Sequence, residues 1–171
     1  TVTVIPGAVD ATTTTINVNM ASVSADDFST STITVRAKDS NGNNRTSTSG
    51  TVVLNATGSA TISSVVDNLD GTYTATIKNA VAENVTISGT IGGNAITDTA
   101  AVTFTPGSVS AADTTIDVAS GSVVADGATS TTITVQAKDG QGNNLTASGG
   151  VVTLTSSGNG SISGVTDNGN G

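Results

Sequence analysis

The sequence predicts an all-β protein made of antiparallel β-sandwiches of about 100 residues each, arranged in tandem. Three observations support this prediction. Apolar residues alternate with polar ones in short runs, turn residues separate these runs, and nearly the same segment occurs twice. The segment from Ser31 reads STITVRAKDSNGNN, and the segment from Thr131 reads TTITVQAKDGQGNN. A period this long fits a whole small domain and not a solenoid unit.

The repeat also sets the expected domain boundaries, because the match runs at one offset without a gap. Residues 1–5 align with the end of the first copy, so we expect them to be the last strand of a preceding repeat. Residues 6–105 form one complete repeat, and residues 106–171 form an incomplete second repeat that lacks its last three strands. A Pro-Gly pair opens each copy, and Pro stiffens a joint while Gly turns it. We expect very short linkers and a chain that is a segment of a longer protein.

Alternation places the expected strands along the first copy. Their inward-facing residues are Ile16 and Val18; Ile33, Val35 and Ala37; Val52 and Leu54; Tyr73, Ala75 and Ile77; Val85, Ile87, Gly89 and Ile91; and Val102 and Phe104. Turns rich in Gly, Asn and Asp separate these runs. No stretch keeps a helical period for long, although we expect one helical turn at residues 79–84, which read NAVAEN. Seven or eight short strands in about 100 residues indicate an antiparallel sandwich.

Composition excludes several function classes. The chain has no His and no Cys, which excludes His-based nucleophilic catalysis, His/Cys zinc sites and disulfides within it. The net charge is -8 with only 5 basic residues, so the basic surface that binds nucleic acid or an anionic membrane is missing. No apolar run is long enough to span a membrane. We expect no enzyme, no nucleic-acid partner and no membrane insertion of this segment.

Calcium is the one cofactor that the sequence leaves open. Acidic and amide side chains in the two DxxGN-type loops have the spacing with which calcium loops begin. These candidate ligands are Asp39, Asn41, Asn43, Asp139 and Asn143. The same loops also fit ordinary β-turns in which Gly42 and Gly142 adopt a positive φ, and this is the interpretation that we favour. Acidic residues in predicted loops could also bind calcium at the joint between two repeats, although solvated surface acids are the interpretation that we favour. These residues are Asp10, Asp26, Asp27, Asp67, Asp70, Asp98 and Asp113.

Two other groups of residues are candidates for modification or for a structural contact. Five Asn-x-Ser/Thr triplets begin at Asn44, Asn55, Asn84, Asn144 and Asn159. They accept glycans only in a cell with that machinery, and they also arise by chance in a chain rich in Thr, Ser and Asn. Tyr73 follows a tight turn at the start of a strand, which is the setting of a tyrosine corner, where the hydroxyl bonds to nearby backbone. The alternative is a half-buried strand tyrosine.

These motifs resemble the bacterial Ig-like domains of invasins and intimins. The matching residues are Asp39, Gly42, Asn43 and Gly50 in the first copy, Asp139, Gly142, Asn143 and Gly150 in the second, and Asp70, Gly71 and Tyr73 once. The position after Gly-Asn, commonly Pro in the family, holds Asn44 and Asn144 here. The resemblance covers the whole chain and implies tandem Ig-like sandwiches. The cysteine-containing lectin-like tip of the family has no counterpart, so the resemblance implies the stalk and not receptor binding.

From this resemblance we expect structural stalk or spacer repeats of a large bacterial adhesin at the extracellular cell surface. They would hold a distal binding domain away from the cell, with neighbouring repeats as partners and a glycan or receptor bound through other domains. One alternative is an adhesive or decoration module, for example of a phage tail or capsid, that binds glycans through the loop aromatic Phe28, although Phe28 fits a core position equally well. Another is a filament subunit assembled by strand complementation, although one donated strand cannot replace three.

Overall fold

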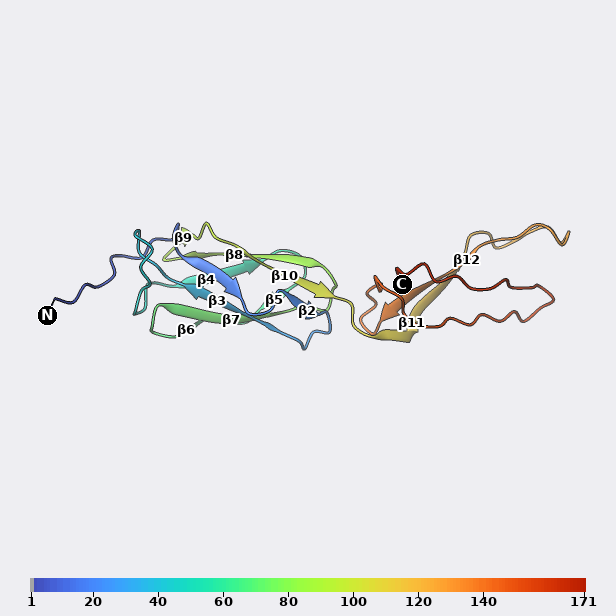
Figure 1. Cartoon of the computed structure of the whole chain (residues 1–171), viewed down its shortest axis with the longest axis horizontal. Coiled ribbons are helices and arrows are strands. Elements are labelled where there is room, and N and C mark those ends of the chain that lie inside the picture. The colour runs from blue at the N-terminus through green and yellow to red at the C-terminus, as the bar shows by residue number, and fades with distance from the viewer. Residues whose placement is uncertain (1) are drawn as a thin grey trace. The chain divides into compact units, whose positions relative to one another are not determined.

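The computed structural model describes residues 2–171, which divide into two compact units with the chain boundary between Thr105 and Pro106 (Figure 1). Every regular element in this part of the chain is a β-strand, so residues 2–171 contain no helix that could cross a membrane. Residue 1 of the strand expected at residues 1–5 lies outside the described residues. Residues 2–5 form no strand, and their assignment to a preceding repeat stays a prediction.

The first unit is a sandwich whose first sheet has the order β1-β3-β7-β5, with β6 also paired to β7. Its strands are β1 (Thr15–Val18), β3 (Ser31–Arg36), β5 (Thr61–Ile62), β6 (Val66–Asp67) and β7 (Thr72–Lys78). All of these pairs are antiparallel, and Val35 of β3 lies opposite Tyr73 of β7. The long strands of this sheet are therefore the ones that alternation predicted.

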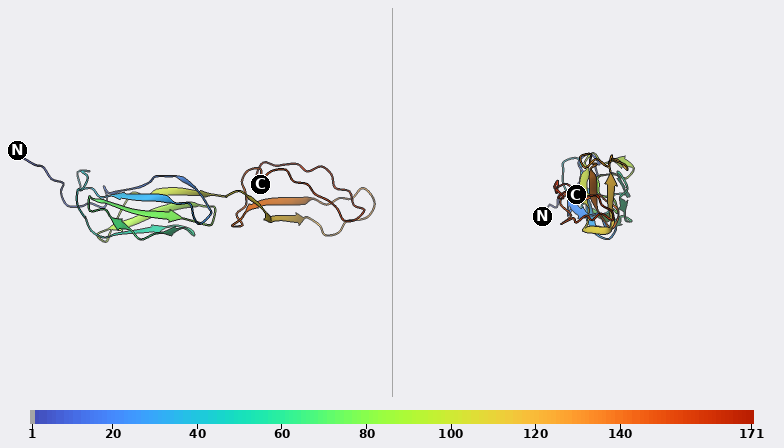
Figure 2. Two further views of the ribbon diagram at one scale, coloured as in Figure 1. Left: turned by 90° about the horizontal axis from the view of Figure 1, so that it is seen from below. Right: turned by 90° about the vertical axis from the view of Figure 1, so that its right-hand side faces the viewer.

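The second sheet has the order β2-β10-β8-β4, with β9 also paired to β8. Its strands are β2 (Ser22–Ser24), β4 (Val52–Ala56), β8 (Asn84–Ile91), β9 (Asn94–Ala95) and β10 (Ala100–Thr105). Figure 2 shows the strands of the first unit running side by side along its length. The pair of β2 and β10 is parallel, which differs from the wholly antiparallel arrangement that we expected.

The core of the first unit lies between these sheets. Burial alternates along β3 and β8, so every second residue faces inward, as the sequence predicted. Tyr73 and Phe104 are the large aromatic residues of this core, each with an exposed fraction of 2%. Phe28 has an exposed fraction of 87%, which excludes it from the core.

The helical turn expected at residues 79–84 does not form, so this prediction was wrong. The side chain of Asn79 accepts the N–H of Val81 at 3.0 Å and donates to Glu83 at 2.8 Å. Strand β8 then begins at Asn84. A side chain that bonds to its local backbone competes with the helical bonds, and here it holds the segment as a loop.

The hydroxyl of Tyr73 connects the two sheets. It accepts the N–H of Ser49 at 2.7 Å, and Ser49 lies 24 residues upstream in the loop before β4. A tyrosine corner bonds to backbone only a few residues away, so the contact differs from the one that we expected. The hydroxyl ties β7 of one sheet to the segment that leads into the other.

We expect Tyr73→Phe to lower the free energy of unfolding by about 1–2 kcal/mol, because it leaves the N–H of Ser49 without its acceptor. Urea unfolding followed by far-UV circular dichroism measures this. Thr76→Val, on the exposed face of the same strand, is the control and should change the free energy by no more than about 0.5 kcal/mol. Equal effects of the two substitutions would contradict the structural role of the hydroxyl.

The second unit contains β11 (Val109–Val118) and β12 (Ile133–Asp139), which form an antiparallel pair with a register shift between Ser110 and Thr115. The carbonyl of Gly171 accepts the N–H of Ala137 at 2.7 Å, as the carbonyl of Gly71 does from Ala37 at 2.9 Å in the first unit.

The counterparts of β2 and β4 in the second unit, residues 122–124 and 152–156, form no strands. In the first unit these strands pair with β10 and β8. Within residues 2–171, the second unit has no strands equivalent to β8 and β10. Residues 122–124 and 152–156 therefore have no partner strand with which to pair.

Candidate functional site

The candidate site is built around Asp39, which lies three residues after the end of β3. Its backbone forms an isolated antiparallel bridge with Val9, and its exposed fraction is only 2%. A buried carboxylate is costly unless hydrogen bonds replace the lost water. The hydrogen bonds of the Asp39 side chain therefore indicate the role of this site.

Both carboxylate oxygens of Asp39 are occupied by N–H donors. Oδ1 accepts the backbone N–H of Asn41 at 3.0 Å and that of Asn43 at 2.9 Å. The side-chain amide of Asn43 donates to Oδ1 at 3.1 Å and to Oδ2 at 3.0 Å. Oδ2 also accepts the N–H of Gly7 at 2.8 Å, which is 32 residues away in the chain. One carboxylate thus closes the turn and fastens the Pro-Gly segment to it.

The second unit repeats this arrangement. Asp139 is 1% exposed, and its Oδ1 accepts the N–H of Gln141 at 3.0 Å and that of Asn143 at 2.8 Å. Its Oδ2 accepts the side-chain amide of Asn143 and the N–H of Gly107, each at 2.9 Å. The change from Asn41 to Gln141 between the two loops is tolerated because only the backbone N–H of this residue bonds to the carboxylate.

Arg45 adds a second fastening in the first unit only. Its guanidinium donates to the carbonyl of Pro6 at 3.1 Å and to the carbonyl of Gly7, and its Nε donates to Ser49 at 3.0 Å. The aligned residue in the second unit is Leu145, whose side chain has no hydrogen-bond donor. This role of Arg45 was not predicted from the sequence. The only sign of it is that Arg45, one of 5 basic residues, has a non-basic counterpart in the second repeat.

Hydrogen bonding lowers the pKa of both carboxyl groups. For Asp39, the side chain of Asn43 and then the N–H of Gly7 make the largest contributions, and they bring the pKa to about 2. For Asp139, burial raises the pKa, but the bonds from Asn143 and Gly107 together outweigh it and the net shift is downward. Both groups are therefore charged in the folded protein at neutral pH.

We expect acid to weaken the hydrogen bonds from Gly7 to Asp39 and from Gly107 to Asp139. Because the folded-state pKa of Asp39 is lowered, its contribution to stability is present above the unfolded-state pKa of about 3.9 and is lost as pH falls toward about 2. Urea midpoints measured from pH 5 to pH 2 should fall in the wild-type chain. The double variant Asp39→Asn, Asp139→Asn should be less stable at pH 5 and should show a shallower fall. An unchanged slope in the variant would contradict this assignment.

Calcium at these loops stays a prediction for Asp39, Asn41, Asn43, Asp139 and Asn143. A calcium ion takes six to eight oxygen ligands, and it would have to displace the N–H donors that now face the carboxylates. Within residues 2–171, no three Asp, Glu, His or Cys side chains come together in a way that could hold a metal. The turn accounts for the observed contacts, with φ at +81° in Gly42 and +83° in Gly142.

Most of the other loop acids bond to residues close to them in the sequence, whereas Asp27 and Asp98 contact distant segments. Asp26 accepts the N–H of Ser29 at 2.6 Å, the hydroxyl of Ser29 at 2.7 Å and the N–H of Phe28 at 2.9 Å, and these bonds bring its pKa to about 2. Asp27 pairs with Lys78 at 3.1 Å. Asp98 accepts the N–H of Ile16, which is 82 residues away, at 2.9 Å. Local contacts are made by Asp10, Asp67, Asp70 and Asp113. The glycosylation candidates Asn44, Asn55, Asn84, Asn144 and Asn159 are all exposed, and their use stays a prediction.

The family model described as invasin domain 3 matches residues 10–107 and residues 110–171. The chain belongs to this family. Invasin, a bacterial integrin-binding protein, is 26% identical with a TM-score of 0.65, over 81% of this chain and 28% of invasin. InvD of Yersinia pseudotuberculosis is 27% identical with a TM-score of 0.63, over 82% of this chain and 45% of InvD. FdeC, an Escherichia coli adhesin, is 26% identical with a TM-score of 0.58, over 82% of this chain and 45% of FdeC.

These matches confirm the invasin-type Ig-like fold and the expected resemblance. The chain has no match among curated proteins. It spans less than half of the length of each of the three solved structures, so it corresponds to a part of such proteins. The relatives are bacterial adhesins, and the chain is an adhesin-related domain segment consistent with a bacterial surface location.

Proposed function

We propose that this invasin-type chain is a stalk segment of a bacterial cell-surface adhesin. It holds a distal binding domain away from the cell, and its partners are the neighbouring Ig-like repeats of a longer chain. Its family and its adhesin relatives support the surface location. Its buried carboxylates fasten backbone, which supports a structural role rather than a catalytic one.

The observation that supports this proposal is a pair of hydrogen bonds that hold the two ends of the linker, residues 105–107. The carbonyl of Thr105 accepts the N–H of Ala25 within the first unit at 2.8 Å. The N–H of Gly107 donates to Asp139 within the second unit at 2.9 Å. Only Pro106 stands between these two fastened residues, and its ring fixes its own φ near about -65°. Few backbone dihedrals are left free, so the linker resists bending.

The strand that leads into the linker also supports a mechanical role. β10 is hydrogen-bonded on one side to β2 and on the other to β8. A pull along the chain at Thr105 therefore acts on a strand held by both of its neighbours. Such a strand leaves its sheet only when both sets of bonds break, which suits a segment that transmits force.

A surface-display experiment tests the proposed function. The chain is placed between an outer-membrane anchor and a small binding domain, and binding of the cells to target-coated beads is measured. The control replaces the chain with a Gly/Ser linker of 171 residues, which forms a flexible coil. We expect stronger bead binding with the chain, because it projects the domain farther. Equal or weaker binding than with the flexible linker would overturn the stalk proposal.

Exposure of Phe28 favours adhesive binding as a second candidate function. The ring is 87% exposed on a loop that Asp26 and the Asp27–Lys78 ion pair hold in place. Rigid exposed aromatics are common anchors of binding sites. The aligned loop of the second unit keeps the Asp126 contacts but carries Ala128. Glycan-array binding that is present in the wild-type chain and lost in Phe28→Ala would support this candidate, and no binding by either protein would exclude glycans as its ligand.

A further inference from the structure

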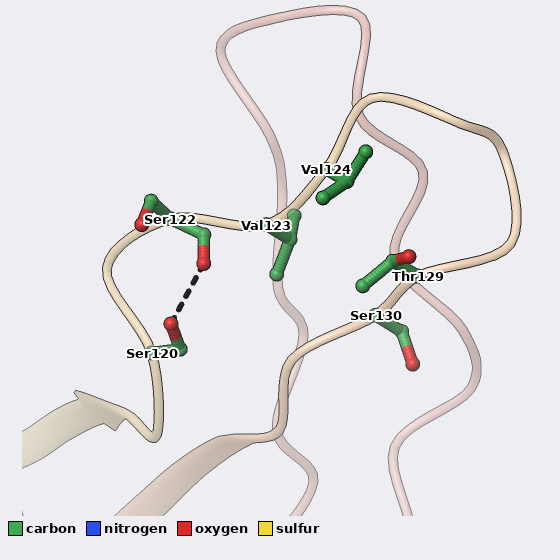
Figure 3. A pocket seen from close by; sticks show the side chains of 6 residues that line it. All are labelled: Ser120, Ser122, Val123, Val124, Thr129 and Ser130. Carbon is green, nitrogen blue, oxygen red and sulfur yellow. Dashed lines mark hydrogen bonds between the residues drawn. The ribbon is translucent and has the colours of Figure 1, made fainter.

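The shallow pocket of the second unit holds hydroxyl groups but no side chain that could activate them (Figure 3). The hydroxyl of Ser120 donates to the carbonyl of Ser122 at 2.7 Å. A serine becomes a nucleophile only beside a general base, and the lining side chains include none. They are Ser120, Ser122, Val123, Val124, Thr129 and Ser130. An Asn-Gly pair, in contrast, reacts without any catalytic side chain.

Asn41 and Gly42 form such a pair in the turn that Asp39 closes. The backbone nitrogen after an asparagine can attack the carbon of its side-chain amide, and glycine hinders this attack least because it has no Cβ. Asn41 and Gly42 are both exposed. Nothing lies within 4 Å of a Cβ atom placed on Gly42, so no packed side chain blocks the approach.

The side chain of Asn41 is free to turn toward this nitrogen. Its amide takes part in no hydrogen bond within residues 2–171, since only the backbone N–H of Asn41 bonds to Asp39, at 3.0 Å. Asp70 and Asp126 also precede a glycine, but each carboxyl group is held by a threonine hydroxyl and a backbone N–H. Asn41 therefore has the mobility that these two side chains lack.

One hydrogen bond restrains the nitrogen of Gly42. Its N–H donates to the carbonyl of Asp39 at 2.9 Å, so the nitrogen becomes available only when the turn opens. An exposed turn opens locally without unfolding of the sheets. The reaction should therefore proceed in the folded protein, at a rate set by the fraction of open turns.

The second unit contains the same turn with a different side chain. The N–H of Gly142 donates to the carbonyl of Asp139 at 3.0 Å, and the φ of Gly142 is +83°. The residue before Gly142 is Gln141, whose side chain is one methylene longer than that of Asn41. Attack on its amide would close a larger ring, which forms more slowly. The two loops thus provide a matched comparison within one molecule.

We propose that Asn41 is a site of spontaneous deamidation, and that the isoaspartate formed there releases Gly7 from Asp39. The nitrogen of Gly42 bonds to Cγ of Asn41, the C–N bond of the side-chain amide breaks, and ammonia leaves with the proton of the Gly42 N–H. Water then opens the succinimide ring. Opening at the side-chain carbonyl gives aspartate, and opening at the main-chain carbonyl gives isoaspartate. This reaction does not depend on the stalk function, so either proposal can fail alone.

The release of Gly7 follows from where the main chain lengthens. Isoaspartate adds a methylene to the backbone between residues 41 and 42. Oδ1 of Asp39 accepts an N–H on each side of this point, from Asn41 at 3.0 Å and from Asn43 at 2.9 Å. A longer segment cannot present both donors in the same way. The carboxylate that accepts the N–H of Gly7 at 2.8 Å therefore loses the turn that positions it.

Peptide mapping of the aged chain tests the site. Trypsin cleaves after Lys38 and Arg45, which isolates residues 39–45. After incubation at mildly alkaline pH, Asn41 should be converted at least about tenfold faster than the other two asparagines of this peptide, because glycine follows neither of them. Electron-transfer fragmentation distinguishes isoaspartate from aspartate. Equal conversion of the three asparagines, or no conversion of Asn41, overturns the proposal.

Exchanging the two loop residues separates the chemistry from the folding of the chain. Asn41→Gln should abolish the reaction in the first unit, and Gln141→Asn should introduce it in the second. Both substitutions keep the backbone N–H groups that bond to Asp39 and Asp139. A Gln141→Asn chain that gains no modification at this position would show that the shared turn does not permit ring closure, which overturns the proposal.

Hydrogen exchange at Gly7 tests the consequence of the reaction. In the isoaspartate form, the N–H of Gly7 should exchange at least about tenfold faster than in fresh protein, because it loses a hydrogen bond to a charged carboxylate. The N–H of Gly107, which bonds to Asp139, is the control within the same sample. Aged Asn41→Gln should keep slow exchange at Gly7. Unchanged exchange at Gly7 in the isoaspartate form would overturn the proposed release.

Discussion

Replacing Phe104 with Ala is expected to lower the free energy of unfolding of the first unit by about 3–5 kcal/mol. The ring is 2% exposed, and it lies on β10 between β2 and β8. Its removal leaves a cavity between two sheets whose core, apart from Tyr73, is made of aliphatic residues. A loss of this size is a large part of the stability of a small domain.

The same substitution at an exposed position serves as the control for Phe104→Ala. Phe28 is 87% exposed, so Phe28→Ala should change the free energy of unfolding by no more than about 0.5 kcal/mol. Both variants are measured by urea unfolding with far-UV circular dichroism. A small effect at Phe104, or an effect at Phe28 of similar size, would contradict the placement of the core.

Replacing Gly71 with Ala is expected to cost more than about 3 kcal/mol, among the strongest effects of single substitutions. Gly71 has a φ of +83°, where a side chain is strained. A Cβ atom there would also lie 2.2 Å from the carbonyl oxygen of Arg45, so the backbone would have to move. Its own carbonyl accepts the N–H of Ala37 just beyond β3, and that bond would be disturbed as well.

Gly42→Ala separates the two contributions to the cost at Gly71. Gly42 has nearly the same φ, +81°, but no atom lies within 4 Å of a Cβ placed there. Only the backbone strain remains, so we expect a loss of about 1–2 kcal/mol. Thermal unfolding of both variants measures the difference. Equal losses would show that the carbonyl of Arg45 does not crowd Gly71.

The sequence was sufficient to predict the long strands, because burial on one face leaves a visible alternation. β3, β7, β8 and β10 lie where that alternation placed them. The strands β2, β5, β6 and β9 contain only two or three residues each, which is too short to show a period. Their positions depend on the neighbours with which they pair, and the parallel pairing of β2 with β10 has no local signal.

The candidate site was predictable only in part. The turn at Asp39 follows from local spacing, since Asn43 and Gly42 lie within four residues of it. The bond from Gly7 spans 32 residues and the bond from Arg45 to Pro6 spans 39, so both arise only when the sheets pack. The loop at Asn79 shows the opposite case, in which a side-chain bond within the segment prevailed over a weak helical pattern.

Nitrogen-15 relaxation of the whole chain at neutral pH tests most directly the claim that Asp139 and Pro106 make a stiff joint. Residues of both units should have the same rotational correlation time in the wild-type chain. Asp139→Ala frees the N–H of Gly107 and should let the two units tumble separately while the first unit stays folded. Separate tumbling of the units in the wild-type chain would contradict a stiff joint at Pro106.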